Sequence, residues 1–147
     1  MKNYTSTVPV ERTISKIEHV LIRAGASHIV KDYQNGKLDG LVFSINEPTS
    51  GKNIAIRLPA NTAAIQKIFQ ARVKRPRRGT LENLAAQAER TAWKIIQDWV
   101  EVQISLIEMK QAEFLEIFMP YIWNGRKTFY LAAKEGGFKM LGPAKED

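Results

Sequence analysis

The chain has 147 residues and a mass of 16.7 kDa, with 44% hydrophobic and 25% charged residues. This size and composition are typical of one globular domain with a buried core, and they exclude global disorder. The sequence contains no cysteine, which excludes disulfides, thiolate metal sites and cysteine nucleophiles. Because no apolar run approaches the roughly 20 residues of a membrane span and no signal-peptide core is present, we expect a cytoplasmic protein without a membrane partner.

The net charge of +7 is distributed unevenly along the chain. Residues 1–79 contain 14 Lys/Arg and 5 Asp/Glu, a net charge of +9. Residues 80–147 contain 8 Lys/Arg and 10 Asp/Glu, a net charge of −2. The asymmetry predicts an uneven electrostatic field at the protein surface.

The first 25 residues predict a short strand followed by a helix. Residues 4–8 are rich in β-branched side chains and favour a strand, which Pro9 confines to a sheet edge or ends. A helix is predicted over 11–24, and Gly25 follows it where a left-handed cap residue is expected. The apolar residues of this helix recur at spacings of three and four and form one face: Ile14, Ile17, Val20, Leu21 and Ala24.

Three strands are predicted next, over 27–33, 38–45 and 53–58. The pair Asn35-Gly36 between the first two is a strong hairpin signal, because both residue types tolerate positive φ. Apolar and polar residues alternate in the second and third strands, with Arg57 directed outward. This period of two predicts an antiparallel sheet with one covered face.

Two helices complete the predicted fold. The first covers 62–72 and is capped by Asn61; the second covers 81–118, is capped by Thr80 and ends before Pro120. At 1.5 Å per residue the second helix would be about 57 Å long, longer than a small domain is wide. We therefore expect it to bend back, to break, or to bury its face against another chain, as in a homodimer.

The long helix has a wide apolar surface. Trp99 lies centrally on the main stripe, so we expect it to be buried. The main stripe consists of Leu84, Ala88, Ile95, Trp99, Val102, Leu106 and Met109, and beside it lie Trp93, Ile96, Val100, Ile107, Phe114 and Phe118. An aromatic segment over 121–130 is expected to pack on this helix, and the tail over 136–147 is expected to be mobile.

The predicted fold class is α+β, in a single domain over 1–147. A three-stranded antiparallel sheet, or a four-stranded one if residues 4–8 join it, is packed on one face by helices, with a long C-terminal helix. A basic loop over 72–79 separates the half that contains the sheet from the half that contains the long helix.

The basic loop is the sharpest feature of the sequence. It contains five cations in seven residues: Arg72, Lys74, Arg75, Arg77 and Arg78. Clustered cations bind nucleic acid by releasing counterions from its phosphates, and the planar guanidinium of arginine donates two hydrogen bonds to one phosphate. We expect these residues to bind DNA or RNA, with Arg57 and Lys67 extending the patch. An acidic protein surface and a merely solvated loop are the alternatives, and the sequence leaves open whether a nucleic acid would be single- or double-stranded.

No pattern in the sequence indicates catalysis. His19 and His28 have no partner at metal-ligand spacing, so no metal or other cofactor is expected. Asp98 and Glu101 share one helix face, as in a two-metal nuclease, but they fit better on a solvated side where Lys94 pairs with Asp98.

Three segments carry a resemblance to a known group of proteins: Val8-Pro9-Val10-Glu11-Arg12-Thr13, Arg57-Leu58-Pro59-Ala60-Asn61, and residues 91–103 with Phe118-Met119-Pro120-Tyr121. Together they resemble an uncharacterised family of small proteins encoded by phages, prophages and other mobile elements. The resemblance covers most of residues 4–131 and implies a role in phage genome maintenance or in interference with host defence. The family has no assigned catalytic residues to carry over.

We therefore expect a non-enzymatic nucleic-acid-binding protein of a phage or other mobile element. The alternative is an anti-defence inhibitor, such as an anti-CRISPR protein, that binds a host complex which targets nucleic acid. In that case the same arginines would contact an acidic protein surface.

Overall fold

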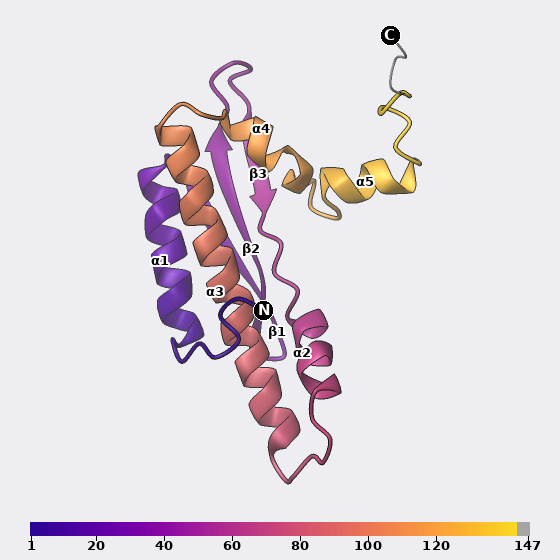
Figure 1. The fold of residues 1–147 in the computed structure, drawn as a ribbon. Helices are drawn as coiled ribbons and strands as arrows, with labels where there is room; N and C mark the ends of the chain where they lie inside the picture. Colours follow the sequence, from indigo (N-terminus) through magenta and orange to yellow (C-terminus); the bar gives the residue numbers. More distant parts are fainter. Residues whose placement is uncertain (144–147) are drawn as a thin grey trace.

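The computed structural model describes residues 1–143 and has an α+β fold (Figure 1). In chain order its elements are α1 (Val10–Arg23), β1 (His28–Gln34), β2 (Lys37–Asn46), β3 (Asn53–Arg57), α2 (Thr62–Ala71), α3 (Thr80–Glu108), α4 (Phe114–Phe118), the 3-10 helix η1 (Met119–Tyr121) and α5 (Phe129–Glu135). Across residues 1–143, none of these helices combines the length and apolar character needed to cross a bilayer.

The three strands form the predicted antiparallel sheet, and their order in it is β1-β2-β3. Asn35 and Gly36 connect β1 to β2 with φ values of +51° and +75°, which confirms the predicted hairpin turn. Leu41 and Phe43 alternate on the buried face of β2, and Ile56 of β3 is buried beside Phe43, its register partner. The alternating pattern of the sequence therefore identifies the covered face correctly.

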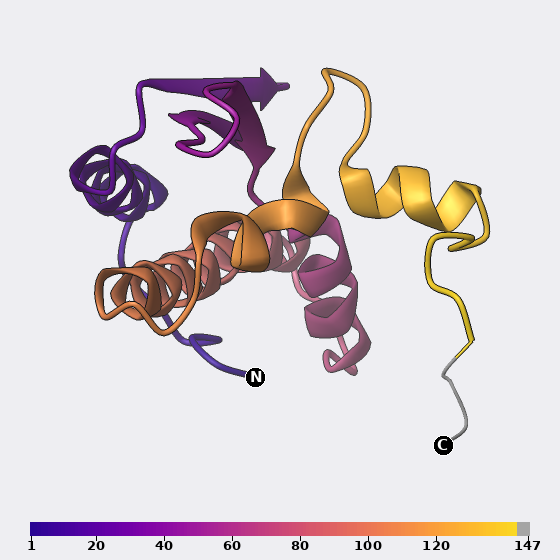
Figure 2. The same ribbon diagram turned by 90° about the horizontal axis from the view of Figure 1, so that it is seen from above.

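Helices α1 and α3 lie side by side on this covered face (Figure 2). The predicted apolar face of α1 is confirmed, since Ile14, Ile17 and Leu21 are all buried. Gly25, with φ of +103°, ends the helix, and the Ala26 amide donates to the Leu21 carbonyl at 2.9 Å. One hydrophobic core joins these helices to the sheet and to α4.

The longest helix, α3, is central in the chain and not C-terminal, and the prediction that it extends to residue 118 is wrong. It ends at Glu108, after 29 residues or about 43 Å. Lys110 adopts a φ of +57°, and the amides of Lys110 and Gln111 donate to the carbonyls of Ile107 (3.0 Å) and Leu106 (2.9 Å). This is a Schellman ending, in which the left-handed position is occupied by lysine where glycine is usual. The sequence therefore lacked the expected stop signal.

The buried face of α3 also differs from the predicted main stripe. Trp93, Ile96 and Val100, which were predicted to lie beside the stripe, are buried because this side faces the sheet and α1. Of the predicted main stripe, Ala88 alone is buried. Trp99 is only half-buried. The remainder of the predicted stripe is exposed at Val102, Leu106 and Met109.

After α3 the chain returns to the free edge of β3. Glu113 and Glu116 form a capping box that starts α4, and Ile122 bridges Ile56 of β3. Tyr121 packs against Trp99, with ring centroids 5.4 Å apart, as predicted for the aromatic segment. The expected mobile tail over 136–147 begins where α5 ends, and residues 144–147 lie outside the described residues.

Phe129 and Tyr130 of α5 are exposed and are not packed on the long helix, contrary to the prediction for the aromatic segment. The segment turns away at Asn124-Gly125, where Gly125 has a φ of +95°. Helix α5 then makes its main contacts with η1 and none of comparable extent with α3.

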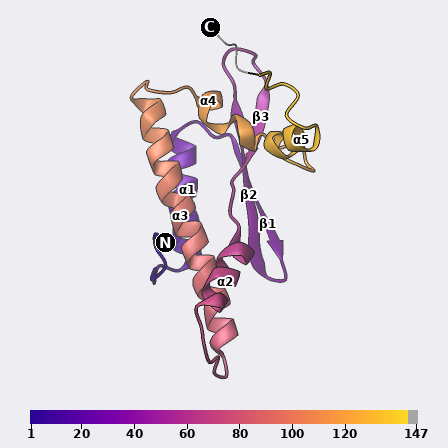
Figure 3. The ribbon, with the colours of Figure 1, turned by 45° about the vertical axis from the view of Figure 1, so that its right-hand side comes forward.

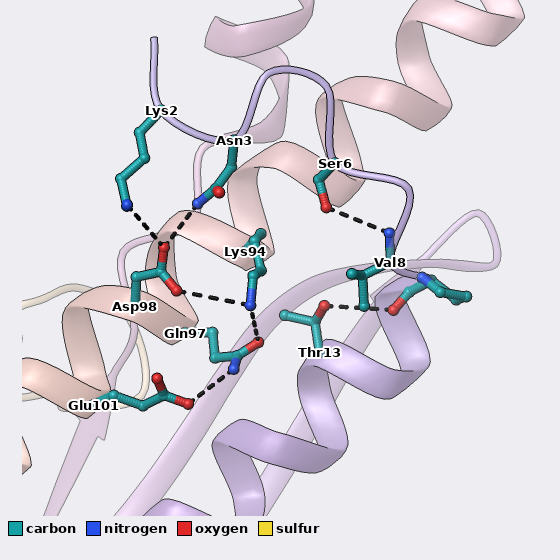
Figure 4. Close-up of polar contacts among 10 residues, drawn as sticks. Lys2, Asn3, Ser6, Val8, Thr13, Lys94, Gln97, Asp98 and Glu101 are labelled. Carbon is teal, nitrogen blue, oxygen red and sulfur yellow. Dashed lines mark hydrogen bonds and ion pairs between the residues drawn. The ribbon is translucent and has the colours of Figure 1, made fainter.

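The predicted strand over 4–8 does not form, so within the described residues the sheet has three strands. This segment instead crosses α3 and is held by side chains of that helix (Figure 4). The side-chain amide of Gln87 donates to the carbonyls of Tyr4 at 2.9 Å and Ser6 at 3.0 Å. Just before the segment, the Asn3 side-chain amide donates to the Asp98 carboxylate at 2.9 Å. Polar side chains of α3 thus form the hydrogen bonds that this backbone would make to a neighbouring strand if it joined the sheet.

Candidate nucleic-acid interface

The basic loop connects the C-terminal end of α2 to the N-terminal end of α3. Helix α2 begins at the predicted cap, where the Asn61 side chain accepts from the Ala64 amide at 3.1 Å. It ends at Ala71, and the amides of Arg72 and Val73 donate to carbonyls of its last turn, at 3.2 Å each. Pro76 cannot continue a helix, so the chain stays irregular.

Gly79 is the N-cap of α3, with a left-handed φ of +80°. The prediction that Thr80 caps the helix is therefore wrong by one residue. The Thr80 hydroxyl instead accepts from the Arg77 amide at 2.9 Å, and the Thr80 amide donates to the Arg77 carbonyl at 3.0 Å. These two hydrogen bonds fix the backbone of the loop at its second half.

The basic loop lies at one end of the molecule, beyond the lower end of the sheet in Figures 1 and 3. The side chains of all five cations, Arg72, Lys74, Arg75, Arg77 and Arg78, are exposed. Among residues 1–143 none of the five forms an ion pair. The loop itself contains no carboxylate, and the next one along the chain is Glu82 of α3.

Lys67 lies on α2, which precedes the loop in the chain. It is exposed and stands five residues before Arg72, which corresponds to about 7.5 Å of helix. Within the described residues it has no ion-pair partner. Lys67 is thus an exposed cation of α2 near the loop along the chain, and its part in one basic surface stays a prediction.

Arg57 lies apart from the basic loop, and its guanidinium already forms ion pairs. It stands at the end of β3, and its guanidinium donates to Asp32 at 2.9 Å and to Asp39 at 3.2 Å. Its guanidinium carbon also lies 4.8 Å from the ring centroid of Trp123. Two carboxylates neutralise this cation, so Arg57 does not belong to the same basic surface.

The two carboxylates considered as a metal pair, Asp98 and Glu101, form contacts with neighbouring side chains. Asp98 pairs with Lys94 at 3.7 Å, as predicted, and also with Lys2 at 3.5 Å (Figure 4). Glu101 instead accepts from Gln97 at 2.8 Å, so the two carboxylates belong to different contacts. No group of three metal-ligating side chains is found in residues 1–143.

One surface was not singled out by the sequence analysis. Around α5 the apolar side chains of Phe129, Tyr130, Leu131, Met140 and Leu141 are exposed. The sequence signal was present as a run of large apolar residues over 129–131, but the expectation that this segment packs on the long helix concealed it.

Comparisons with protein-family models, with curated proteins and with solved structures found no match to this chain.

Proposed function

We propose that the protein is a non-enzymatic nucleic-acid-binding protein of a phage or other mobile element, and that its basic loop binds phosphates. The observation that carries the proposal is the set of five exposed cations at one end of the molecule, without an ion-pair partner in the described residues. Cations that pair within a protein must lose those contacts to bind phosphate, whereas these have none to lose. The resemblance noted in the sequence supplies the biological setting of the proposal.

The start of α3 adds to the positive potential of the loop. Gly79 has no side chain to cap the first turn, so among residues 1–143 no side chain satisfies the amides there, and Glu82 places one carboxylate in the same turn. The partial positive charge of a helix N-terminus favours anions over the first turn. Lys67 adds a sixth cation on α2, and we assign no part of the phosphate contact to Arg57.

The test compares two triple variants that remove the same charge. The loop variant is R75A/R77A/R78A, and the matched control is R12A/K16A/R23A on α1, where all three cations are exposed and form no ion pair within residues 1–143. Anisotropy of labelled 20-nucleotide DNA and RNA, each single- and double-stranded, is measured at about 50 mM salt. We expect the loop variant to lose at least about tenfold in affinity for the bound form and the control about twofold or less.

Equal losses in the two variants would show that only the overall charge matters, and would overturn the assignment to the loop. Failure of the wild type to bind any of the four forms would overturn the proposed function itself. Both variants are expected to stay folded, because exposed substitutions usually change stability by about 0.5 kcal/mol or less each.

A second candidate function is the anti-defence inhibitor, and the exposed apolar surface around α5 is the observation that favours it. Exposed clusters of aromatic and aliphatic side chains often mark protein–protein interfaces. For this candidate, the purified protein would bind naked nucleic acid weakly and would capture a nucleic-acid-targeting complex from the host. The substitution Leu131→Asp would abolish that capture and leave nucleic-acid binding by the wild-type loop unchanged.

A further inference from the structure

The composition around the basic loop restricts the kind of nucleic acid that it can bind. Proteins that bind single strands combine cations with exposed aromatic side chains, on which the unpaired bases stack. Between residues 44 and 92 the chain has one aromatic residue, Phe69, and its side chain is only 6% exposed. The loop and the helix ends beside it therefore offer charge and no stacking surface.

Two exposed aromatic residues lie near α3: Tyr33 of β1, which lines one cavity with Glu89, and Tyr4, whose place relative to the loop follows from its hydrogen bond. The side chain of Tyr4 is 53% exposed, and its carbonyl accepts from the side-chain amide of Gln87 at 2.9 Å. Gln87 stands seven residues after Thr80, about 10 Å along α3. In Figure 1 the N-terminus likewise lies beside the middle of α3 and away from the loop at its lower end. Tyr4 is thus set back from the loop cations.

A site that binds through charge alone favours the partner with the higher density of phosphates. A double strand presents one negative charge per about 1.7 Å of its axis, and each of its strands alone one per about 3.4 Å. The five cations stand within seven residues, on a loop that lies at one end of the molecule, beyond the sheet (Figure 3). A flexible single strand would have to be ordered to supply as many phosphates, with no stacking to compensate.

We infer that the basic loop selects double-stranded nucleic acid and binds it through its phosphates, without base stacking. This inference rests on the proposed function and narrows it. Lys67 on α2 would contact the same duplex, since it continues the exposed cations of the loop.

The test is a competition experiment with the wild-type protein. A labelled 20-bp DNA duplex of mixed sequence is displaced by the same unlabelled duplex, by the RNA duplex of that sequence, or by dT20 and rU20, at about 100 mM salt. We expect either duplex to compete at least about tenfold better than its single-stranded counterpart, and the DNA and RNA arms distinguish the two sources of duplex. Single strands that compete as well as the duplexes would overturn the inference and leave the proposed function standing.

The variant Tyr4→Ala provides the second arm. We expect it to leave the affinities for duplex and for dT20 unchanged within about twofold. A selective loss of dT20 binding would show that a base stacks on Tyr4, and would overturn the inference. Absence of binding to every form would count against the proposed function, so the two failures are distinguishable.

Discussion

The guanidinium of Arg57 crosses strand β2 to reach the carboxylate of Asp32 on β1, 2.9 Å away. It passes over Gly40, where an added Cβ would lie 2.3 Å from Nη2 and 2.5 Å from Cζ of Arg57. Trp123 covers the guanidinium and is held by its own amide, which donates to the Ala55 carbonyl at 2.8 Å. One arginine thus joins all three strands and the segment that returns from α4.

This arrangement predicts a cost for a side chain at residue 40. In Gly40→Ala the guanidinium must leave its position, and we expect the free energy of unfolding to fall by about 1–2 kcal/mol. Exposed ion pairs alone contribute little, so most of the loss should come from the contact with Trp123 and from repacking. Urea denaturation measures it.

The double variant Gly40→Ala/Arg57→Ala is the control. If the clash between the added Cβ and the Arg57 guanidinium is the cause, the double variant should lose about as much stability as Arg57→Ala alone, because the guanidinium is no longer there. Strictly additive losses would show that Gly40 is required for a different reason.

The packing around α3 predicts losses of stability of different size for two tryptophan substitutions. Trp93 is fully buried, so Trp93→Ala should cost about 3–5 kcal/mol. Trp99 is half-buried and contacts Phe118 and Tyr121 edge-on, so Trp99→Ala should cost clearly less. Thermal and urea unfolding of both variants show which substitution lowers the free energy of unfolding more. A larger decrease for Trp99→Ala would contradict the packing described.

The N-terminal segment predicts a pH-dependent contribution to stability. Burial raises the pKa of Asp98, but hydrogen bonds from Asn3 and Lys2 and the charge of Lys94 outweigh it, so the pKa lies below its ordinary value. A carboxylate with a lowered pKa stabilises the fold above its unfolded pKa, near 4, and this contribution is lost as the pH falls through the folded pKa.

We therefore expect Asp98→Asn to reduce the free energy of unfolding by about 0.5–1 kcal/mol at pH 7, and by less at about pH 3. The measurement is urea denaturation at both pH values. Glu108→Gln is the matched control, since Glu108 is exposed and forms no ion pair within residues 1–143. A deficit for Asp98→Asn that is the same at both pH values would argue against this role.

The exposed part of the apolar stripe on α3 predicts self-association. Val102, Leu106 and Met109 occupy one side of the helix and are exposed. We expect a monomer–dimer equilibrium at micromolar concentration, which sedimentation equilibrium detects, and Leu106→Glu should shift it to monomer. Asn83→Glu adds the same charge to an exposed position near the other end of α3 and should have little effect. A wild type that is monomeric throughout would refute the association.

The sequence predicts those elements whose signals are local. Asn35-Gly36, Gly25 and Asn61 each act through their own backbone or side chain, and the structure confirms all three. The end of α3 was missed because its left-handed residue is Lys110, which has no distinctive pattern. Helix periodicity defines apolar stripes, but the positions of the sheet and α1 decide which stripe is buried.

The same distinction holds for the candidate site. The exposure of the basic loop follows from a local pattern of cations with Pro76 and Gly79. No local pattern predicts the contacts of Arg57, because Asp32 and Trp123 are distant from it in the sequence and meet it only in the fold. The hydrogen bond between Asn3 and Asp98 is equally nonlocal. For this reason the segment over 4–8, which has the composition of a strand, packs on α3 and does not join the sheet.

The salt dependence of binding measures how many phosphates the basic loop contacts. Affinity of the wild type for a 20-bp duplex is measured from about 50 to 200 mM salt, beside the loop variant R75A/R77A/R78A and the control R12A/K16A/R23A. Each lost phosphate contact makes the slope of log affinity against log salt shallower by about 0.9. We expect the loop variant to be shallower by about 2 to 3 and the control to match the wild type. Equal slopes for wild type and loop variant, or no binding at about 50 mM salt, would contradict the assignment of phosphate binding to the basic loop.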